Sequence, residues 1–345
     1  MIKLGIIFGG KSGEHEVSLM SATSVLKAID HTKYIPVMIG ISRNGDWQLY
    51  EGEVDRIEDG TWEESATALS LDKLKETADF LLPIVHGTYC EDGTLQGLLE
   101  MLDIPYGGCG VLASAAAMDK LIAKELFLRA GLPSCRYVGV VLSQFEESSV
   151  SELAEAVGGY PCFVKPANMG SSVGVSKATN EKELLEAIRK AGKFDRRLII
   201  EEGMNIREVE TAVIGNDEPI VSVAGEIIPS AEFYDYTAKY FDGGQSKLII
   251  PAEIPKETAD RIREYAARAY RALDCSGFAR VDFFVKKETG EVYINEINTI
   301  PGFTKFSMFP VLFGASGIEY PQLIERIVDY GYERYNIKNS RQTSL

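Results

Sequence analysis

The chain has 345 residues, of which 45% are hydrophobic and 25% charged, as in an ordinary globular protein with room for two or three domains. Its 36 Lys and Arg residues against 51 Asp and Glu residues give a net charge of −15, which argues against nucleic acid or an anionic membrane as the main partner. The N-terminus lacks the features of a signal peptide, no segment is apolar for long enough to cross a membrane, and the five cysteines are scattered. These features predict a cytoplasmic protein with reduced thiols.

The N-terminal residues have the order strand, glycine-rich turn and helix. Residues 3–8 (KLGIIF) are typical of a buried strand, and residues 18–29 of a helix with Ser18 as a possible N-cap, which predicts an α/β fold. Residues 5–12 also satisfy the P-loop pattern G-x-x-x-x-G-K-S. The match is interpreted as accidental, because its variable positions belong to the apolar strand instead of a phosphate loop. Glu14 follows the turn, either as a charge near the helix start or as a carboxylate that meets an ammonium group.

The α/β order continues with two further strands. Residues 34–42 and 80–87 are strand-like, and His86 lies at the end of the second, where open parallel sheets bind ligands. A single histidine there is more often structural than catalytic. The amphipathic helix that follows can be capped by Thr94 or Asp92.

A second unit begins with a helix over residues 111–130, which carries Lys120 and ends at a glycine followed by proline. Farther on, an apolar strand carries Lys165 and enters a glycine-rich loop with Ser171 and Ser172. Such a loop can point backbone N–H groups and hydroxyls at phosphate oxygens, while the lysine offsets their charge. A flexible hairpin turn is the alternative.

Two more strands and a long loop come next. Glu201 ends the first strand and Glu208 begins the second, so both could bind an adenine amine or ribose hydroxyls, or be surface charges. Residues 229–250 form a tyrosine-rich connection that is typical of a lid or binding loop, with Lys239 and Tyr240 as its functional candidates. Helices are expected at residues 256–272 and 319–336.

Two apolar runs around the polar segment KKETGE predict an antiparallel hairpin. If Lys286 pairs with Val292, alternation along the strands gathers four polar side chains on one face. These are Arg280, Asp282, Glu296 and Asn298. Two carboxylates and an amide oxygen suit Mg²⁺ or Mn²⁺ shared with substrate phosphates, whereas a solvated face with an Arg280–Asp282 ion pair is the alternative. The four residues alone leave both open.

The order of these motifs resembles the ATP-grasp superfamily and, within it, the D-alanine–D-alanine ligases. The resemblance spans nearly the whole chain through GGKSGEHEVS, HGTYCEDGTLQG, MDK, VKPANMGSSVGV, FYDYTAKY, GFARVDFF and NEINTIPGFTKFSMFP. It implies an α/β (α+β) fold in three domains: a Rossmann-like substrate-binding domain (1–108), a central ATP-grasp subdomain (109–201), and a C-terminal ATP-grasp subdomain (202–345) with the metal site and the lid loop 229–250. The nucleotide would lie between the two α+β domains.

The resemblance also implies roles for individual residues. ATP phosphates would be held by Lys120, Lys165 and Ser172, and the adenine and ribose by Glu201, Glu202 and Glu208. Two Mg²⁺ or Mn²⁺ ions would be held by Asp282, Glu296 and Asn298. Glu14 would bind the first D-alanine's ammonium in a triad with Ser171 and Tyr240, and His86 would lie near its carboxylate. Arg280 and the Gly302 N–H would stabilise an oxyanion, and the γ-phosphate and second carboxylate would be held by Lys239, Ser307 and Met308.

The reaction implied is ATP-dependent joining of two D-alanines through a D-alanyl phosphate, for peptidoglycan precursors, by a homodimer. Relatives join D-alanine to D-serine or D-lactate, but Lys239-Tyr240 resembles the amine-acceptor type and Met308 favours D-alanine. A non-catalytic nucleotide-binding regulator on the same scaffold is a further alternative.

Overall fold

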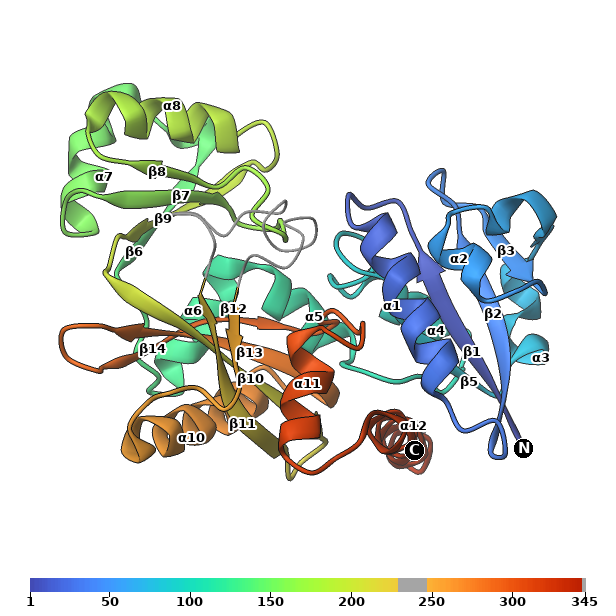
Figure 1. The fold of residues 1–345 in the computed structure, drawn as a ribbon. Coiled ribbons are helices and arrows are strands. Elements are labelled where there is room, and N and C mark those ends of the chain that lie inside the picture. Colours follow the sequence, from blue (N-terminus) through green and yellow to red (C-terminus); the bar gives the residue numbers. More distant parts are fainter. Residues whose placement is uncertain (229–246, 343–345) are drawn as a thin grey trace.

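The computed structural model describes residues 1–228 and 247–342, which form three β-sheets with helices packed against them (Figure 1). Lys239 and Tyr240 therefore lie outside the described residues. The mixed α/β class predicted from the sequence is confirmed. The predicted domain boundaries at residues 108 and 201 stay a prediction.

The first sheet has the strand order β4-β3-β2-β1-β5, and its three apolar strands β1, β2 and β5 are parallel. Its elements are β1 (Ile2–Gly9), α1 (His15–Ala28), β2 (Tyr34–Ile41), β3 (Trp47–Tyr50), α2 (Asp55–Glu58), β4 (Thr67–Ala68), α3 (Leu74–Thr77), β5 (Phe80–Pro83) and α4 (Thr94–Met101). Gly5 lies inside β1, paired with Val37 and Leu81, which confirms that the P-loop match is accidental.

Two predicted helix caps in this part of the chain need correction. Glu14, not Ser18, is the N-cap of α1, and the Ser18 hydroxyl instead donates to the Ile84 carbonyl and accepts the Gly9 N–H at 2.8 Å. At α4 the N-cap is Gly93, whose φ of +88° favours glycine, and the Asp92 carboxylate accepts the Thr94 N–H at 3.0 Å. The Ser18 cap is thus wrong, whereas Asp92, one of the two predicted caps of α4, binds the first N–H of that helix from the residue before the N-cap.

The second sheet is antiparallel, with the order β6-β9-β7-β8, and two helices cover one of its faces (Figure 1). Its elements are β6 (Tyr137–Val141), α7 (Val150–Ala156), β7 (Cys162–Pro166), β8 (Ser176–Ala178), α8 (Glu181–Ala191) and β9 (Arg197–Glu202). The strand that carries Lys165 is β7, as predicted.

The third sheet is also antiparallel, with the order β12-β11-β10-β13-β14. Its elements are β10 (Ile206–Gly215), β11 (Ile220–Ile228), β12 (Lys247–Ile249), α10 (Lys256–Ala272), β13 (Gly277–Lys286), β14 (Val292–Asn298) and α11 (Met308–Ala315). Strand β12 takes up part of the stretch predicted as a lid loop and pairs with β11.

The helix predicted at residues 111–130 is two helices, α5 (Val111–Met118) and α6 (Lys120–Arg129). The break lies at Asp119, which has extended backbone angles and accepts the Ile122 N–H at its side chain at 3.1 Å, capping α6. Both helices contribute to the core below the third sheet, together with Ile262 and Tyr270 of α10.

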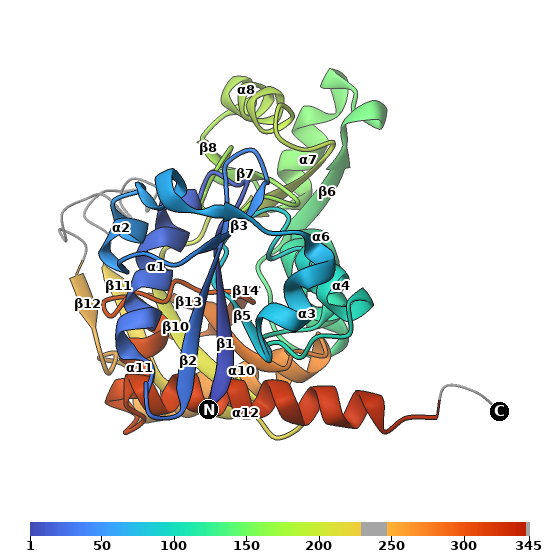
Figure 2. The ribbon, with the colours of Figure 1, turned by 90° about the vertical axis from the view of Figure 1, so that its right-hand side faces the viewer.

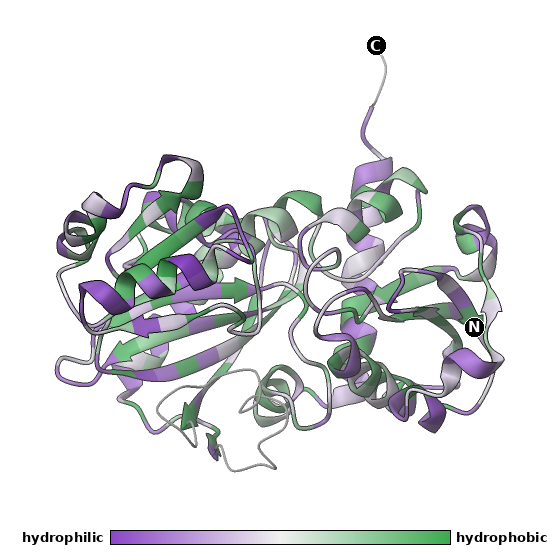
Figure 3. Ribbon diagram, turned by 90° about the horizontal axis from the view of Figure 1, so that it is seen from above, coloured by the Kyte–Doolittle hydropathy of each residue, from purple (hydrophilic) through white to green (hydrophobic). Residues whose placement is uncertain are grey.

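The last helix, α12 (Tyr320–Asn339), crosses beneath the first sheet (Figure 2). The predicted buried face is confirmed, because Leu323, Ile324, Ile327 and Val328 belong to the same apolar cluster as residues of β1 and β5. Along the strands and the helices hydrophobic residues alternate with hydrophilic ones (Figure 3). No helix within residues 1–228 and 247–342 is long and apolar enough to span a membrane.

Candidate active site

The hairpin β13–β14 gathers the four polar residues predicted from the sequence. Asp282 lies opposite Glu296 and Arg280 opposite Asn298, as predicted. The predicted pairing of Lys286 with Val292 is wrong by one residue, since Val285 pairs with Val292. The register shifts next to Asp282, so β14 carries one extra residue, a β-bulge that sequence alternation does not reveal.

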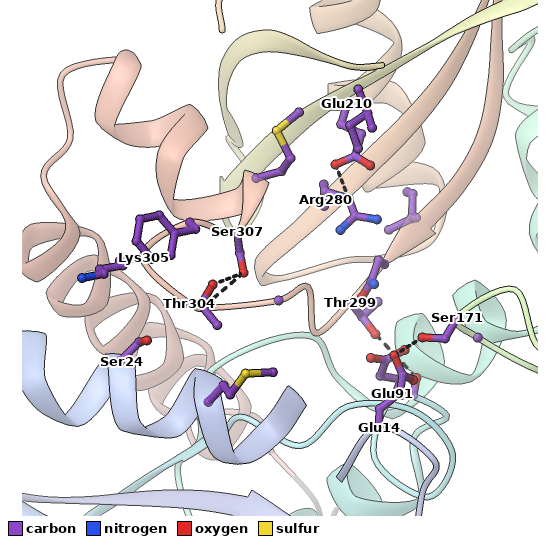
Figure 4. A pocket seen from close by; sticks show the side chains of 18 of the residues that line it. Glu14, Ser24, Glu91, Ser171, Glu210, Arg280, Thr299, Thr304, Lys305 and Ser307 are labelled. Atoms are coloured by element: carbon purple, nitrogen blue, oxygen red, sulfur yellow. Dashed lines mark hydrogen bonds and ion pairs between the residues drawn. The ribbon is translucent and has the colours of Figure 1, made fainter. Parts of the chain in front are cut away.

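Arg280 is tightly held on this face. Its guanidinium donates two hydrogen bonds of 2.7 Å to Asp282, and its Nε lies 2.9 Å from Glu210 Oε2 on β10 (Figure 4). Glu210 lies opposite Asp282 in the sheet and was missed by the sequence analysis. Its alternation with Glu208 along one strand was the available signal. The ion pair that the sequence left as an alternative therefore exists, and Glu210 adds a second carboxylate to it.

The residues on this face fit a divalent cation. Asp282 and Glu210 share the Arg280 guanidinium, and Glu296 lies opposite Asp282 in the sheet, so negative charge is in excess. Carboxylate and amide oxygens are the ligands that Mg²⁺ prefers. Asn298 Oδ1 accepts the Ile300 N–H at 3.0 Å and keeps a second lone pair. In the described part of the chain no group of three or more His, Cys, Asp or Glu side chains is placed to hold a metal, so the predicted set depends on Asn298.

A cavity of about 1080 Å³ borders this face and is lined by strands of the third sheet, by α1 and by the glycine-rich loop after β7 (Figure 4). The predicted site residues that line it are Glu14, Lys120, Ser171, Arg280, Glu296, Asn298, Gly302, Ser307 and Met308. Glu91 and Glu210 line it as well. Predicted residues outside this lining are His86, Lys165, Ser172, Glu201, Glu202, Glu208 and Asp282.

Glu14 and Ser171 meet across the cavity. The Ser171 hydroxyl donates to Glu14 Oε1, which joins the start of α1 to the glycine-rich loop after β7 (Figure 4). Ser171 and Ser172 both have left-handed backbone angles, with φ of 50° and 59°, an uncommon conformation that is concentrated at functional loops. Two members of the predicted triad are thus in contact, and the third lies outside the described residues.

Glu201 is buried between two lysines. Its Oε2 lies 2.6 Å from Lys165 Nζ, and its Oε1 lies 2.9 Å from Lys124 Nζ. Burial alone would raise the pKa of Glu201, but the two ammonium groups outweigh burial and hold it far below its usual value. The same carboxylate raises the pKa values of Lys124 and Lys165 against the effect of burial. Lys124 was missed, although a lysine between buried Ala123 and Phe127 was a visible signal.

The remaining nucleotide candidates have partners within the protein. Lys120 donates to the Met169 carbonyl at 2.7 Å and so holds the glycine-rich loop. Glu202 pairs with Arg136. Glu208 is the last residue of the half-exposed part of β10, on the same strand as Glu210.

His86 is almost fully buried and bonds to the protein instead of lining the cavity. Its Nδ1 donates to the Ile300 carbonyl at 2.8 Å, and its Nε2 lies 3.0 Å from Ser21 Oγ. Burial lowers the pKa of His86, but the Glu91 carboxylate, 3.8 Å from Nδ1, outweighs it, so the pKa is raised.

Gly302, Ser307 and Met308 border the cavity where β14 passes into α11. Ser307 is the N-cap of α11, and its hydroxyl pairs with Thr304 Oγ1 at 2.8 Å and accepts the Thr304 N–H at 3.1 Å. The N-terminus of α11, with its partial positive charge, thus faces the cavity and suits an anion.

Comparisons with known proteins agree with this geometry. The family model described as D-ala D-ala ligase N-terminus matches residues 3–109, and the one described as D-ala D-ala ligase C-terminus matches residues 126–329. The chain belongs to the D-alanine–D-alanine ligase family. Members of this family use ATP and a divalent metal and act on small molecules.

The similarity to individual ligases extends over whole chains. A curated D-alanine–D-alanine ligase of Acetivibrio thermocellus is 50% identical over 361 residues, with 96% of each chain covered. The crystal structure of VanG D-Ala:D-Ser ligase from Enterococcus faecalis superposes with a TM-score of 0.87 at 39% identity, covering 96% of this chain and 99% of that one. The D-alanine–D-alanine ligase of Coxiella burnetii gives 0.87 at 33% identity, covering 98% and 97%.

Proposed function

We propose that this chain joins two D-alanine molecules into D-alanyl-D-alanine, converting ATP to ADP and phosphate, for the synthesis of peptidoglycan precursors. The observation that carries the proposal is the hairpin face of Arg280, Asp282, Glu296 and Asn298, whose cavity also holds Glu14 and the N-terminus of α11. Three kinds of site therefore border the same cavity. They are carboxylates for metal-bound phosphates, an acceptor for an ammonium group, and a site for an anion. This is what a carboxylate-amine ligase needs.

The first half-reaction forms an acyl phosphate. Glu14, oriented by Ser171, accepts hydrogen bonds from the ammonium of the first D-alanine. A carboxylate oxygen of that D-alanine attacks the γ-phosphorus, the bond to ADP breaks, and D-alanyl phosphate forms. Lys120, Lys165 and the loop of Ser171 and Ser172 bind the phosphates.

The metal ions would be Mg²⁺ or Mn²⁺, two in number, held by Asp282, Glu296 and Asn298. When bound, they offset the negative charge that crowds around the transferred phosphoryl group. The adenosine would lie against β9 and the start of β10, where Glu201, Glu202 and Glu208 are found. Glu201 acts there chiefly by fixing Lys165, because Lys165 and Lys124 already lie within 3 Å of its two oxygens.

The second half-reaction forms the peptide bond. The α11 N-terminus, with Ser307 and the Met308 N–H, binds the carboxylate of the second D-alanine. Its neutral amine attacks the acyl carbon, the C–O bond to phosphate breaks, and the leaving phosphate takes up the proton that the amine loses. Arg280 and the Gly302 N–H stabilise the oxyanion that develops on the acyl oxygen. Arg280 is already oriented by Asp282 and Glu210, so little reorganisation is needed.

D-Serine is the second candidate acceptor, because the chain is 39% identical to a D-Ala:D-Ser ligase over nearly its whole length. Met308 favours D-alanine. Lys239 and Tyr240, proposed for the γ-phosphate and the triad, lie outside the described residues. A homodimer in the cytoplasm completes the proposal.

Phosphate release tests this function. The purified chain with ATP and Mg²⁺ is expected to release phosphate only when D-alanine is added, and D-serine or D-lactate beside D-alanine is expected to add little product. Product mass distinguishes D-alanyl-D-alanine from mixed products. No release with any of the three compounds would favour the non-catalytic regulator, and release independent of all three would indicate ATP hydrolysis instead of ligation.

A further inference from the structure

The segment 300–303, which carries Gly302, is held from the first sheet's side of the cavity. His86, which follows β5, donates from Nδ1 to the Ile300 carbonyl at 2.8 Å. Ser21, on α1, accepts the Phe303 N–H at 3.2 Å, and its hydroxyl lies 3.0 Å from His86 Nε2. The two side chains therefore bind the peptide groups on either side of Gly302 and also bind each other.

These contacts persist whether or not His86 carries a proton. A carbonyl oxygen only accepts, so Nδ1 must hold a hydrogen in both states. In the neutral ring Nε2 accepts the Ser21 hydroxyl proton, and in the imidazolium it donates to Ser21 Oγ. Ser21 is fully buried and His86 is 2% exposed, so water does not compete for these bonds.

The polar groups at the two ends of the segment are bound as well. Asn298 Oδ1 accepts the Ile300 N–H at 3.0 Å, and the Tyr320 hydroxyl donates to the Phe303 carbonyl. Pro301 has no N–H. Within the part of the chain that the structure describes, the Gly302 N–H has no hydrogen-bond partner, and Gly302 lines the cavity. The segment is thus fixed at both ends with a single peptide donor left for a ligand.

We propose that Ser21 and His86 are positioning residues that aim the Gly302 N–H at the oxyanion of the second half-reaction. This inference rests on the proposed function, in which the Gly302 N–H is an oxyanion donor. The clamp of Ser21 and His86 belongs to the first sheet and its helix, whereas Gly302 follows the third sheet. The contacts of Ser21 and His86 with the segment 300–303 therefore fix the direction of the Gly302 N–H.

The hydrogen-bond network around His86 also extends to Glu14, the proposed acceptor of the first D-alanine's ammonium. The Ser12 hydroxyl donates to the His86 carbonyl at 2.5 Å and accepts the Glu14 N–H at 3.2 Å. Backbone positions of His86 and Glu14 are therefore linked through one serine. A single buried network orients the acceptor of the first D-alanine's ammonium and the oxyanion donor, so the acyl carbon is held relative to both.

The test separates the two half-reactions in the full-length enzyme. Ser21→Ala removes the hydroxyl that accepts the Phe303 N–H, and Ser114→Ala is the matched control, since Ser114 is also a fully buried helical serine and lies outside the cavity lining. Steady-state dipeptide formation reports the whole reaction. Formation of the acyl phosphate alone is followed by positional isotope exchange. The ATP carries ¹⁸O between the β- and γ-phosphorus, and the exchange is measured in the presence of D-alanine.

We expect Ser21→Ala to lower kcat for the dipeptide about tenfold while isotope exchange stays within about twofold of wild type, because a misdirected donor weakens only the second step. Ser114→Ala should leave both rates unchanged. A second pair, His86→Ala and His86→Asn, should show partial rescue by asparagine, whose side-chain N–H can replace Nδ1.

Two results would overturn the inference. One is wild-type kcat in both Ser21→Ala and His86→Ala, and the other is an equal fall of isotope exchange and dipeptide formation in the variants, which indicates general damage to the site. Either result leaves the proposed function standing so long as the wild-type enzyme makes the dipeptide. A wild-type enzyme that makes none would refute the proposed function itself.

Discussion

Lys124 Nζ lies 2.9 Å from Glu201 Oε1, and both side chains are at most 3% exposed. Lys124 also donates to Ser134 Oγ at 3.0 Å. Because Glu201 binds Lys165 as well, the helix α6 and the strands β7 and β9 are joined by one buried charge cluster. A buried charge that loses its partner is costly, so this cluster gives the first prediction.

Lys124→Met is expected to destabilise the fold by about 3 kcal/mol, because the buried Glu201 is left with Lys165 as its one cation. The KM for ATP should rise, because the carboxylate that positions Lys165 loses its own second partner. Thermal or urea unfolding and steady-state kinetics measure the two effects. Lys256→Met is the control, since Lys256 forms an exposed i,i+4 pair with Asp260 that should contribute less than about 1 kcal/mol. An equal loss of unfolding free energy in Lys124→Met and Lys256→Met would contradict the prediction.

The acid stability of the protein should depend on Glu201. Its pKa is lowered on folding, so its contribution is fully present above the unfolded value of about 4.3 and is lost as the pH falls below it. Glu201→Gln removes this contribution, so its unfolding free energy should fall less steeply between about pH 5 and pH 3, by up to about 1.4 kcal/mol per pH unit. Urea unfolding at several pH values measures the slope, and parallel curves for the two proteins would rule this out.

Asp282→Asn is expected to raise the Mg²⁺ concentration for half-maximal activity by about tenfold or more, because a charged metal ligand is lost. Glu210→Gln is the comparison. It removes the other carboxylate beside Arg280, so it should lower kcat but keep the wild-type Mg²⁺ dependence. Mg²⁺ titrations of phosphate release measure this. An Asp282→Asn enzyme with full activity at the wild-type Mg²⁺ concentration would remove Asp282 from the metal site.

Gly302→Ala is expected to raise the KM for the second D-alanine about tenfold. A Cβ at Gly302 would lie 3.0 Å from Ser307 Oγ, so the added methyl group crowds the proposed carboxylate site. Gly314→Ala is the control, because a Cβ there meets nothing within 4 Å and alanine favours the helix α11. D-Alanine titrations measure the effect, and unchanged kinetics in Gly302→Ala would mean that the acceptor lies elsewhere.

Local patterns were enough to predict most strands and the opposition of Asp282 and Glu296. Side-chain alternation and turn position determine which residues share a face, so the four polar residues were found together. The β-bulge beside Asp282 was not predicted, because the extra residue on β14 leaves the alternation of apolar residues on either side of the bulge intact. The break at Asp119 was missed for a similar reason, since a capping aspartate inside a helical pattern can also be a surface residue.

Relations between distant elements could not be predicted. Lys124 joins Glu201 only because α6 packs beside β9, and Glu210 joins Arg280 only because β10 pairs with β13. His86 was placed by resemblance near a substrate carboxylate, yet its ring binds Ser21 and Ile300. Contacts of this kind depend on how the three sheets are arranged, which periodicity does not encode.

The fate of the D-alanine carboxylate oxygens tests most directly whether the reaction passes through D-alanyl phosphate. D-Alanine labelled with ¹⁸O in its carboxylate is incubated with the enzyme, ATP and Mg²⁺, and the released phosphate is examined by mass spectrometry. Ligation through D-alanyl phosphate predicts one ¹⁸O atom in each phosphate formed with D-alanyl-D-alanine, because the attacking oxygen leaves with the phosphoryl group. Phosphate without ¹⁸O would show that water receives the phosphoryl group, and would contradict ligation through D-alanyl phosphate.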